Sequence, residues 1–464
     1  MIQFDSAVIS GILPKSKGAY IVGGSVRDLL LGKPPVDYDI VVYENPKEFA
    51  KKIAKKTSGR LVELGKPEQM IFRVVSKNCV YDISHITGAS IEDDLLKRDF
   101  TINALAWDLS LKRVIDCVDG QRDITDRKIR MVSKAIFQKD PIRLIRAYRI
   151  SATFDFDIEP QTTAAIKDNA ELLKTSAGER IRSELLKILG SSNSYYFLSQ
   201  MVKTGILQAI FPELNDLQTC FQNRYHLFDV LKHTMKAYSH LETILNDCHH
   251  FLPEAYGQFK PCTDTFKGAL LKCSILLHDI GKPSARTIDK KGNIHFYGHG
   301  KKSADMAKNI TRRLRFSNHE ASYIDFIIRN HIRPLFLFTA HQNKTITQKG
   351  IARFFLKCGK YAPDLLIHTM ADIEGKGNKN DKRNEAFINF SREMVKYYFS
   401  YFQPEKLKPP LITGSDLINN FALTPSPLFK RVLWRVEEAR ITKKIKNKDE
   451  AIQLAKDILK HEGH

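Results

Sequence analysis

The pattern of apolar and polar positions changes near residue 130 of this 464-residue chain. Before that point, short β-branched runs predict strands over 20–22, 38–43, 71–75 and 79–83. Helical periodicity predicts helices between them, over 26–31 and 47–56. From about 135 onward the apolar positions recur with helical spacing, as in 141–153, 180–189 and 227–245. The sequence therefore predicts an α+β fold, with a sheet-containing front and an all-α remainder.

Breaks in the helical pattern divide the remainder further. Polar stretches rich in Pro or Gly lie near Phe211-Pro212, over 375–384 and over 403–410. Together with the change near 135, they predict domains over 1–135, 136–215, 216–375 and 376–464.

Composition excludes several classes of protein. Hydrophobic residues make up 43% of the chain, enough to bury cores, so extensive disorder is excluded. No uncharged apolar run approaches the ~20 residues that a bilayer span needs. The first residues lack the pattern of a secretory signal. The seven cysteines include no CxxC pair and predict reduced thiols. We therefore expect a cytoplasmic protein without a membrane partner.

The positive charge is unevenly distributed. Lys and Arg total 73 against 52 Asp and Glu, a net charge of +21. Residues 1–130 hold 21 against 18, and residues 131–464 hold 52 against 34. This excess indicates a polyanionic partner for the later region, although solvated, lysine-rich helix faces would give the same numbers.

A glycine turn follows the first predicted strand. Gly23 and Gly24 allow close approach of a ligand to the backbone, and the helix that opens there offers free N–H groups to an anion. Arg27 adds a charged fork. The turn is a candidate phosphate site.

Three aspartates are candidate metal ligands. Asp37 and Asp39 lie two apart on a predicted strand and share a face, and Asp82 lies on another strand. Carboxylates this close repel one another unless a cation lies between them, and Mg²⁺ suits such oxygen ligands. The alternative is that Asp37 and Asp39 are turn residues after Pro34-Pro35.

Segments 23–32, 92–106 and 140–149, with Asp37 and Asp39, resemble the motifs of class II nucleotidyltransferases, the bacterial tRNA CCA-adding enzymes and poly(A) polymerases. The resemblance implies a polymerase-β-like palm followed by a helical neck. It also implies attack of an RNA 3′-hydroxyl on the α-phosphate of a nucleoside triphosphate. Asp37, Asp39 and Asp82 would be catalytic, with Mg²⁺ on Asp37 and Asp39. Nucleotide-binding residues would be Gly23, Gly24, Arg27, Arg98 and Asn103.

The third segment carries a row at spacing three, Asp140, Arg143, Arg146 and Arg149. By resemblance, this row reads the edge of the incoming base, and an Asp and Arg pair suits the amino groups of C and A. Alternatively, Asp140 caps a helix that starts at Pro141, and the arginines pair with phosphates or surface carboxylates. Lys139 replaces a glutamate that is frequent in the family, which leaves base selection open.

Spaced histidines form another candidate site. His233, His278-Asp279 and Asp372, on predicted helices, resemble the ligand order of an HD domain, a helical metal phosphohydrolase fold. The resemblance implies a divalent metal of unspecified identity on these four residues. His299 and His331 would extend the site to a second metal. A fold retained without catalysis is the alternative.

The C-terminal stretch resembles the family's tail, with Pro425-Ser426-Pro427 where Pro-Gly-Pro is usual. Basic residues there are candidate RNA contacts or solvated helix ends: Lys430, Arg431, Lys443 and Lys444.

These observations predict an enzyme that adds or repairs the 3′-terminal CCA of tRNA from CTP and ATP. The alternatives are an A-adding or CC-adding enzyme, a poly(A) polymerase, and an RNA-binding HD phosphohydrolase with an inactive palm. Oligomeric state is not indicated by the sequence.

Overall fold

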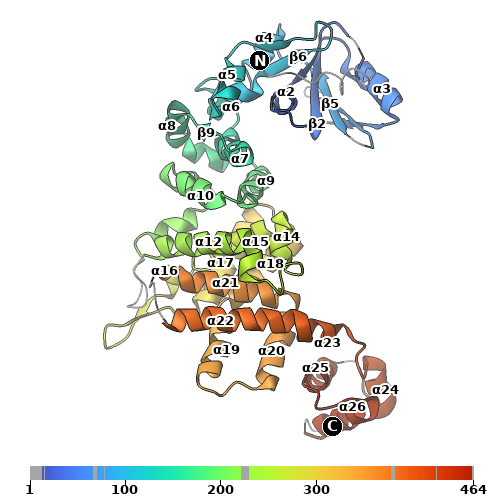
Figure 1. The fold of residues 1–464 in the computed structure, drawn as a ribbon, viewed down its shortest axis with the longest axis vertical. Coiled ribbons are helices and arrows are strands. Elements are labelled where there is room, and N and C mark those ends of the chain that lie inside the picture. The colour runs from blue at the N-terminus through green and yellow to red at the C-terminus, as the bar shows by residue number, and fades with distance from the viewer. Residues whose placement is uncertain are drawn as a thin grey trace. The chain divides into compact units, whose positions relative to one another are not determined.

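The structure is a computed structural model that describes residues 13–14, 16–65, 70–77, 79–220, 229–377, 382–424 and 426–461. Its contacts divide the chain into two compact units. The first contains Met1–Ile188 and Gln200–Ile210, and the second contains Leu189–Ser199 and Phe211–His464 (Figure 1).

A seven-stranded mixed sheet forms the start of the first unit, in the order β3-β4-β5-β2-β1-β6-β7. The strands are β1 (Ala19–Val22), β2 (Asp37–Val42), β3 (Arg60–Leu64), β4 (Ile71–Val75), β5 (Val80–His85), β6 (Leu105–Asp108) and β7 (Val114–Asp116). Only β2 and β5 pair in parallel among the strands of this sheet, and their register places Asp39 opposite Asp82. In β2 the side chains alternate, with Tyr38 and Ile40 buried and the aspartates exposed.

Short helices accompany the sheet. They are α2 (Gly24–Leu30), α3 (Pro46–Thr57), α4 (Ile91–Leu95) and α5 (Gly120–Thr125). Asn45 caps α3 by accepting from the N–H groups of Lys47 and Glu48, and Pro46 occupies its first turn. The predicted sheet-containing front, with helices between its strands, is confirmed.

The first unit continues as helices. They are α6 (Ile136–Lys139), α7 (Arg143–Phe154), α8 (Pro160–Asp168), α9 (Gly178–Leu189) and α11 (Ile206–Ile210). A small parallel pair, β8 (Lys128–Ile129) with β9 (Asp157–Ile158), ties α7 to the end of the sheet region. The suggestion that Asp140 caps a helix beginning at Pro141 is wrong. Helix α7 begins at Arg143 without a side-chain cap, and the Asp140 carboxylate pairs elsewhere.

The second unit is built around helices that are buried on almost every side. Residues Gly268–Leu277 of α15 (Thr265–Leu277) and Ala362–Ile373 of α21 (Ala362–Glu374) are all buried. Helices this apolar all round belong at the centre of a helical layer structure. Lys272, the one charged residue in that part of α15, forms an ion pair of 3.0 Å with Glu242.

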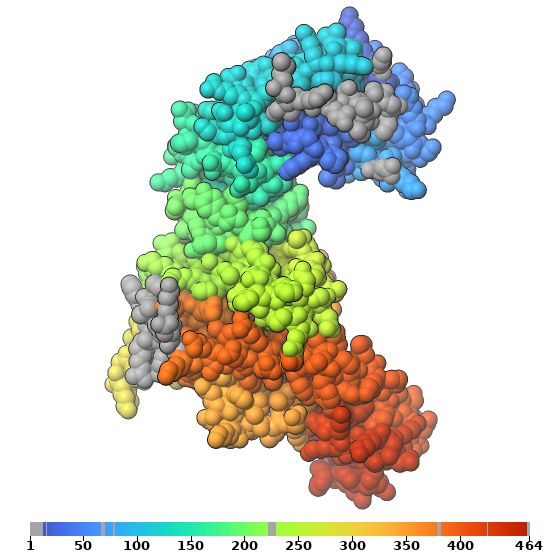
Figure 2. Space-filling model, viewed as in Figure 1, coloured from blue at the N-terminus to red at the C-terminus, as the bar shows by residue number. Residues whose placement is uncertain are grey.

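Other helices surround this centre, and α12 packs along α21 although the two are far apart in sequence. In Figure 2 the yellow-green and orange surfaces of this unit adjoin accordingly. The surrounding elements are α12 (Val230–Asn246), α13 (Cys248–Phe251), α14 (Lys260–Thr263), α16 (Lys282–Ala285), β10 (Thr287–Ile288), β11 (Ile294–His295), α17 (His299–Arg313), α18 (Asn318–Asn330), α19 (Arg333–Gln342) and α20 (Gln348–Cys358). Helix α10 (Ser194–Lys203) precedes them.

The last part of the chain has its own apolar core. This part of the chain contains α22 (Lys382–Tyr397), α23 (Gln403–Leu407), α24 (Gly414–Phe421), α25 (Pro427–Ile441) and α26 (Lys448–His461). Leu417, Val432 and Ala455 are fully buried in the core shared by α24, α25 and α26. Pro425, within the predicted tail turn, lies outside the described residues, as do 378–381 of the predicted break and the start of the helix predicted from 227.

The expectation that every cysteine is a reduced thiol differs from the structure at one pair. Cys248 and Cys262, on α13 and α14, are joined as a disulfide with their Cα atoms 6.2 Å apart. The other five cysteines are free thiols. Sequence spacing did not show this pair, because the chain between α13 and α14 folds back on itself.

Candidate functional site

The three aspartates of the sheet lie side by side. Asp37 and Asp39 are two apart on β2, and Asp39 is paired in register with Asp82 of β5. Loss of hydration raises the pKa of Asp39 to about 6, the charges of Asp37 and Asp82 add to the rise, and Arg98 opposes it. A group of carboxylates that resists full ionisation has the donor chemistry of a divalent-cation site, so the residues fit the predicted metal.

Asp82 differs from the other two because it already has a cationic partner. Its two oxygens accept from Nε and Nη2 of Arg73, each at 2.7 Å. Arg73 lies on the adjacent strand β4, directly opposite Asp82. The structure therefore brings all three predicted carboxylates together but neutralises only Asp82 by a bidentate ion pair.

The glycine turn lets an arginine approach the aspartates. Gly23 has a φ of 75°, and a Cβ there would lie 2.7 Å from Nη1 of Arg98 and 3.6 Å from Oδ2 of Asp39. Arg98 is held from its other side by Asp94, whose Oδ2 is 2.9 Å from Nη2. Only glycine leaves room for this approach, so the turn positions a guanidinium beside the carboxylates.

A serine fixes the distance between the turn and β2. The hydroxyl of Ser25 donates to the carbonyl of Asp37 and accepts from the N–H of Asp39, both at 3.1 Å. The sequence prediction missed this residue. The sequence signal for Ser25 was its position directly after the two glycines. From there its side chain reaches the start of the neighbouring strand β2.

Arg27 faces the protein interior. It donates to Asp28, and its Nη1 donates to Oδ1 of Asn103 at 2.5 Å. Its guanidinium also lies 4.1 Å from the ring centre of Phe154, at the end of α7. Arg27 and Asn103, both predicted to bind nucleotide, are thus direct partners, and burial lowers the pKa of Arg27.

The arginines on α7 contact segment 92–106 through the buried side chain of Asp99. Asn103 donates to Oδ1 of Asp99 at 2.9 Å, and Arg146 donates to Oδ2 at 3.2 Å. Burial opposes the charged form of Asp99, but Arg146 and the hydrogen bonds from Asn103 and the Phe100 N–H hold its pKa below the ordinary value. Asp99 was not predicted, since its role appears only when the three motifs fold together.

The other members of the row also have protein partners. Arg143 donates to the carbonyl of Lys97 at 3.0 Å, and Arg149 donates to Glu184 at 2.9 Å. Both oxygens of Asp140 accept from Arg180, at 3.0 and 2.9 Å. Contacts to segment 92–106 and to α9 therefore hold the side chains of this row in place.

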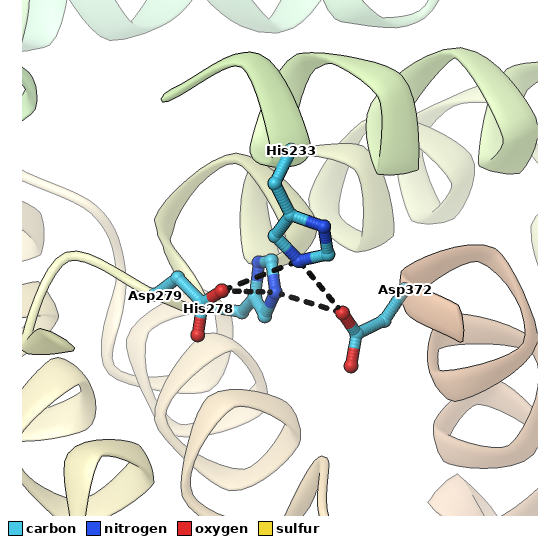
Figure 3. A group of neighbouring side chains, drawn as sticks. All are labelled: His233, His278, Asp279 and Asp372. Atoms are coloured by element: carbon cyan, nitrogen blue, oxygen red, sulfur yellow. Dashed lines mark ion pairs between the residues drawn. The ribbon is translucent and has the colours of Figure 1, made fainter. Parts of the chain in front are cut away.

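The predicted histidine and aspartate ligands converge in the second unit (Figure 3). His233 comes from α12, Asp372 from α21, and His278-Asp279 from the turn that ends α15. Nε2 of His233 lies 2.9 Å from Asp372, and Nε2 of His278 lies 3.1 Å from Asp279. The ligand atoms of all four residues lie within 4.8 Å of one another, and all four are buried.

Charge in this cluster is balanced by close contacts. Burial opposes ionisation of Asp279, but His278, Lys282 and the hydrogen bond from His233 hold its pKa well below the ordinary value. Burial likewise lowers the pKa of His278, but Asp279 and Asp372 outweigh it and raise the pKa to about 10. Two imidazoles and two carboxylates suit a divalent transition metal, and an ion would replace the protons that balance the cluster here.

His299 and His331 lie beside this cluster, as predicted, and form a second group with Asp279. His368, which the prediction missed, is fully buried against the rings of His278 and His331. Its signal was its position four residues before Asp372, on the same helical face. The predicted tail residues Lys430, Arg431, Lys443 and Lys444 are exposed on and after α25.

Comparison with known families agrees with this order of sites. Residues 19–130 match the "Poly A polymerase head domain", 155–218 the "Probable RNA and SrmB-binding site of polymerase A", 225–346 the "HD domain", and 381–455 a tRNA nucleotidyltransferase domain 2. The fold and the motifs thus define a nucleotidyltransferase with an HD domain.

Relatives that align over almost their whole length identify the family of this nucleotidyltransferase more closely. An A-adding tRNA nucleotidyltransferase of Deinococcus radiodurans is 30% identical over 444 residues, which cover 94% of this chain and 95% of the relative. A CC-adding tRNA nucleotidyltransferase of Synechocystis sp. is 28% identical and covers 98% and 96%. The chain belongs to the tRNA nucleotidyltransferase family and is an enzyme of that class.

Solved structures share the fold. The Thermotoga maritima CCA-adding enzyme in complex with tRNA aligns with a TM-score of 0.62 at 22% identity, over 99% of this chain and 93% of that one. A CCA-adding enzyme in complex with CTP aligns with a TM-score of 0.65, with the same identity and coverage. None of the described helices combines the length and apolar character that a bilayer span requires.

Proposed function

We propose that this enzyme adds or repairs the 3′-terminal CCA of tRNA, using CTP and ATP and releasing pyrophosphate. The observation that carries the proposal is the continuous chain of side-chain contacts between three separate motifs. Arg27 binds Asn103, Asn103 binds Asp99, and Asp99 binds Arg146 of the base-reading row. The solved CCA-adding enzymes support this reaction, and the relatives named for addition of A and of CC support nucleotide addition to tRNA.

The chemistry follows from the residues. Mg²⁺ bound by Asp37 and Asp39 would acidify the attacking 3′-hydroxyl and neutralise charge on the leaving pyrophosphate. Asp39 binds a cation as the carboxylate. Its neighbours Asp37 and Asp82 are the other proposed catalytic carboxylates. Arg98, between Gly23 and Asp94, would hold the triphosphate. Gly24 would let the triphosphate approach the start of α2.

Base selection belongs to the row Asp140, Arg143, Arg146 and Arg149. An aspartate that accepts and an arginine that donates suit the amino group and ring nitrogen of C or A, and they reject U and G. Because Arg180 holds both oxygens of Asp140, an incoming base must compete with this ion pair or use the remaining lone pairs.

The domain boundaries 1–135, 136–215, 216–375 and 376–464 are part of the proposal. The exposed tail residues Lys430, Arg431, Lys443 and Lys444 would contact tRNA phosphates, and the surplus of basic residues after 130 supports this. Action on tRNA places the enzyme in the cytoplasm.

A narrower activity is the second candidate, because the full-length relatives include A-adding and CC-adding enzymes. One assay decides between them. The purified enzyme receives tRNAs ending at the discriminator base, at C and at CC, with CTP and ATP supplied singly and together. Full CCA on the shortest tRNA supports the main proposal, whereas A on CC alone, or CC without A, identifies a partial enzyme.

Two other outcomes of that assay would contradict the proposal. Long A tracts on unrelated RNA would identify a poly(A) polymerase. No incorporation into any RNA would leave an RNA-binding HD protein with an inactive palm.

We also propose that His233, His278, Asp279 and Asp372 hold a divalent metal for hydrolysis of phosphate esters. The buried convergence of two imidazoles and two carboxylates supports it. Hydrolysis of a 2′,3′-cyclic phosphate that needs metal and disappears in His278→Ala would bear this out. A parent enzyme without such hydrolysis would leave the domain structural.

A further inference from the structure

The hairpin of β10 and β11 projects from the surface of the second unit, where it forms the yellow protrusion in Figure 2. Its turn is closed by the N–H of Asp289, which donates to the carbonyl of Asn293 at 3.0 Å. Gly292 has a φ of 79° and supplies the left-handed position of the turn. The two central residues of the turn, Lys290 and Lys291, are therefore exposed at the tip of the hairpin.

An aromatic stack lies at the base of this hairpin. The rings of His295 and Tyr297 are 11° from parallel, and their centres are 5.1 Å apart. Nε2 of His295 donates to the carboxylate of Asp289 at 3.0 Å, so the imidazole is held in place. Tyr297 is 75% exposed, so most of its ring surface faces solvent. An oriented aromatic ring with an open surface is the feature on which proteins stack the bases of single-stranded RNA.

The stack lies next to the histidine cluster. The carbonyl of Phe296, which lies between the two stacked residues, accepts from Nδ1 of His299 at 2.8 Å. Nε2 of the same His299 lies 3.5 Å from Oδ1 of Asp279. The Phe296 ring centre lies 5.6 Å from Nζ of Lys282, which contacts Oδ2 of Asp279 at 2.6 Å. Tyr297 precedes His299 by two residues, a span of at most about 7 Å of chain. A nucleotide stacked on Tyr297 would therefore have its phosphate beside the cluster.

The charge around the stack is complementary to RNA. Residues 286–302 contain five basic residues and one acidic residue. The basic residues are all exposed: Arg286, Lys290, Lys291, Lys301 and Lys302. The single acidic residue, Asp289, uses its oxygens within the hairpin, where they accept from His295 and Asn293. Positive charge beside an open aromatic ring is the combination that binds single-stranded nucleic acid.

We propose that this hairpin binds the single-stranded 3′ end of an RNA, with the terminal base stacked on Tyr297 and the preceding phosphates beside Lys290 and Lys291. The inference rests on the hydrolysis proposed for the histidine cluster and names the substrate class of that site, a terminal ribonucleotide of RNA. The hairpin takes no part in the bond change itself. In that step water adds to phosphorus, one P–O bond of the cyclic phosphate breaks, and the released ribose oxygen takes the proton.

The first test compares substrates with and without a base. The full-length enzyme receives adenosine 2′,3′-cyclic phosphate or methyl riboside 2′,3′-cyclic phosphate, with Mg²⁺, Mn²⁺ and Ni²⁺ supplied in turn. The parent enzyme should prefer the adenosine compound. In Tyr297→Ala this preference, measured as the ratio of the two kcat/KM values, should fall about tenfold and mainly through KM, because stacking holds the base. Tyr297→Phe keeps the ring and should retain the preference.

Tyr256→Ala is the matched control. Tyr256 lies in the same unit, is 42% exposed and meets His249 with the ring centres 5.8 Å apart, outside the hairpin. Its replacement should leave the preference unchanged. Lys290→Glu combined with Lys291→Glu should weaken binding of a short oligoribonucleotide that ends in the cyclic phosphate and should reduce the salt dependence of that binding. Circular dichroism confirms that each variant is folded.

A cross-link tests the RNA contact independently of hydrolysis. An oligoribonucleotide with a 3′-terminal 4-thiouridine is irradiated with the full-length chain carrying Asp37→Ala and Asp39→Ala. Mass spectrometry then identifies the linked peptides after digestion with trypsin. The expected peptide is 292–301, which contains both stacked rings. The cross-link to this peptide should be lost in Tyr297→Ala and retained in Tyr256→Ala.

The hairpin and the proposed hydrolysis fail in different ways. A parent enzyme that hydrolyses both substrates equally well, or an unchanged preference in Tyr297→Ala, overturns the hairpin and leaves the hydrolysis. An equal loss of preference in Tyr256→Ala has the same consequence. A parent enzyme without hydrolysis that still cross-links at 292–301 overturns the hydrolysis and supports the RNA contact. Absence of any cross-link within 292–301 overturns the hairpin, whatever the activity.

Discussion

The sheet aspartates and the buried histidine cluster are two different kinds of candidate metal site in one chain. Asp37 and Asp39 keep exposed surface on β2, although Asp39 loses part of its hydration, and both offer only oxygen ligands, whereas His233 and His278 are fully buried and offer nitrogen. An exposed oxygen site suits Mg²⁺ that arrives with a triphosphate. A buried site with imidazole suits an ion that stays through turnover. We therefore expect burial and donor type together to set how long an ion remains at each site.

The strongest test of this comparison is to remove the palm carboxylates. Asp37→Ala with Asp39→Ala should lower nucleotide addition to tRNA by about a thousandfold, since metal charge stabilisation is worth several kcal/mol. The hydrolysis proposed for the HD cluster should be unchanged. Primer extension and cyclic phosphate hydrolysis, measured on the same preparation, check both. Intact addition in the double variant would refute the palm assignment.

Metal removal should separate the two sites by rate. Brief dialysis against a chelator should reduce nucleotide addition about a hundredfold, with full recovery as soon as Mg²⁺ returns, because an ion held by solvent-accessible carboxylates should exchange freely. HD hydrolysis should survive brief dialysis and fail only after prolonged treatment. Activities followed against dialysis time measure this. Simultaneous loss of both activities would remove the distinction.

Gly23→Ala should damage the palm without touching the HD cluster. The new Cβ would meet Arg98 at 2.7 Å and would stand at a φ of 75°. We expect kcat/KM for the nucleotide to fall by about tenfold, equal to about 1.4 kcal/mol. Gly32→Ala is the control, since its φ of 69° carries the same backbone strain but nothing lies within 4 Å of its Cβ. Equal losses in both variants would assign the effect to strain alone.

The pH dependence should also differ between the sites. The pKa of Asp39 is raised to about 6, so the folded protein binds this proton more tightly than the unfolded chain does. Without metal, the contribution of Asp39 to folding stability is fully present below the pKa that this group has in the unfolded chain. That contribution is lost as the pH rises through about 6. Cation binding needs the carboxylate, so addition at low Mg²⁺ should fall about tenfold per pH unit below 6. Higher Mg²⁺ should move the profile to lower pH, and a profile independent of Mg²⁺ would contradict this.

The smallest expected effect concerns base choice. Arg180→Ala removes both hydrogen bonds that orient Asp140. Discrimination of CTP over UTP should decrease by about threefold, in keeping with the modest energy of an exposed ion pair. Competition assays with the two nucleotides measure it. Arg127→Ala, which breaks the exposed pair with Asp155, should leave discrimination unchanged; a similar decrease there would make the effect nonspecific.

The sequence predicted features that depend on local spacing. The pair Asp37 and Asp39 and the strand that carries them could be read from residue types and spacing, whereas the order His233, His278-Asp279, Asp372 was indicated by its resemblance to an HD domain. The sequence could not predict that Arg73 neutralises Asp82, because this ion pair depends on the register of β4 with β5. The sequence also did not predict the place of His368 beside the cluster. A single histidine on an apolar helix can have several roles, and only the packing of the helices shows which side chains surround it.

Two local predictions failed because packing outweighed local preference. Asp140 has the character of a helix cap, but its ion pair with Arg180 takes the carboxylate away from the helix. Cys248 and Cys262 lack any motif, and only the return of the chain at α14 brings them together.

The stacking of Arg27 on Phe154 constrains which mutations this protein can tolerate. The flat guanidinium fills the space above the ring while its edge reaches Asp28 and Asn103. Lysine would preserve the charge but has neither the flat surface nor the fork. We therefore expect substitutions at Arg27 on α2 and at Phe154 in the last turn of α7 to be coupled, so that a change at one position costs less once the other has changed.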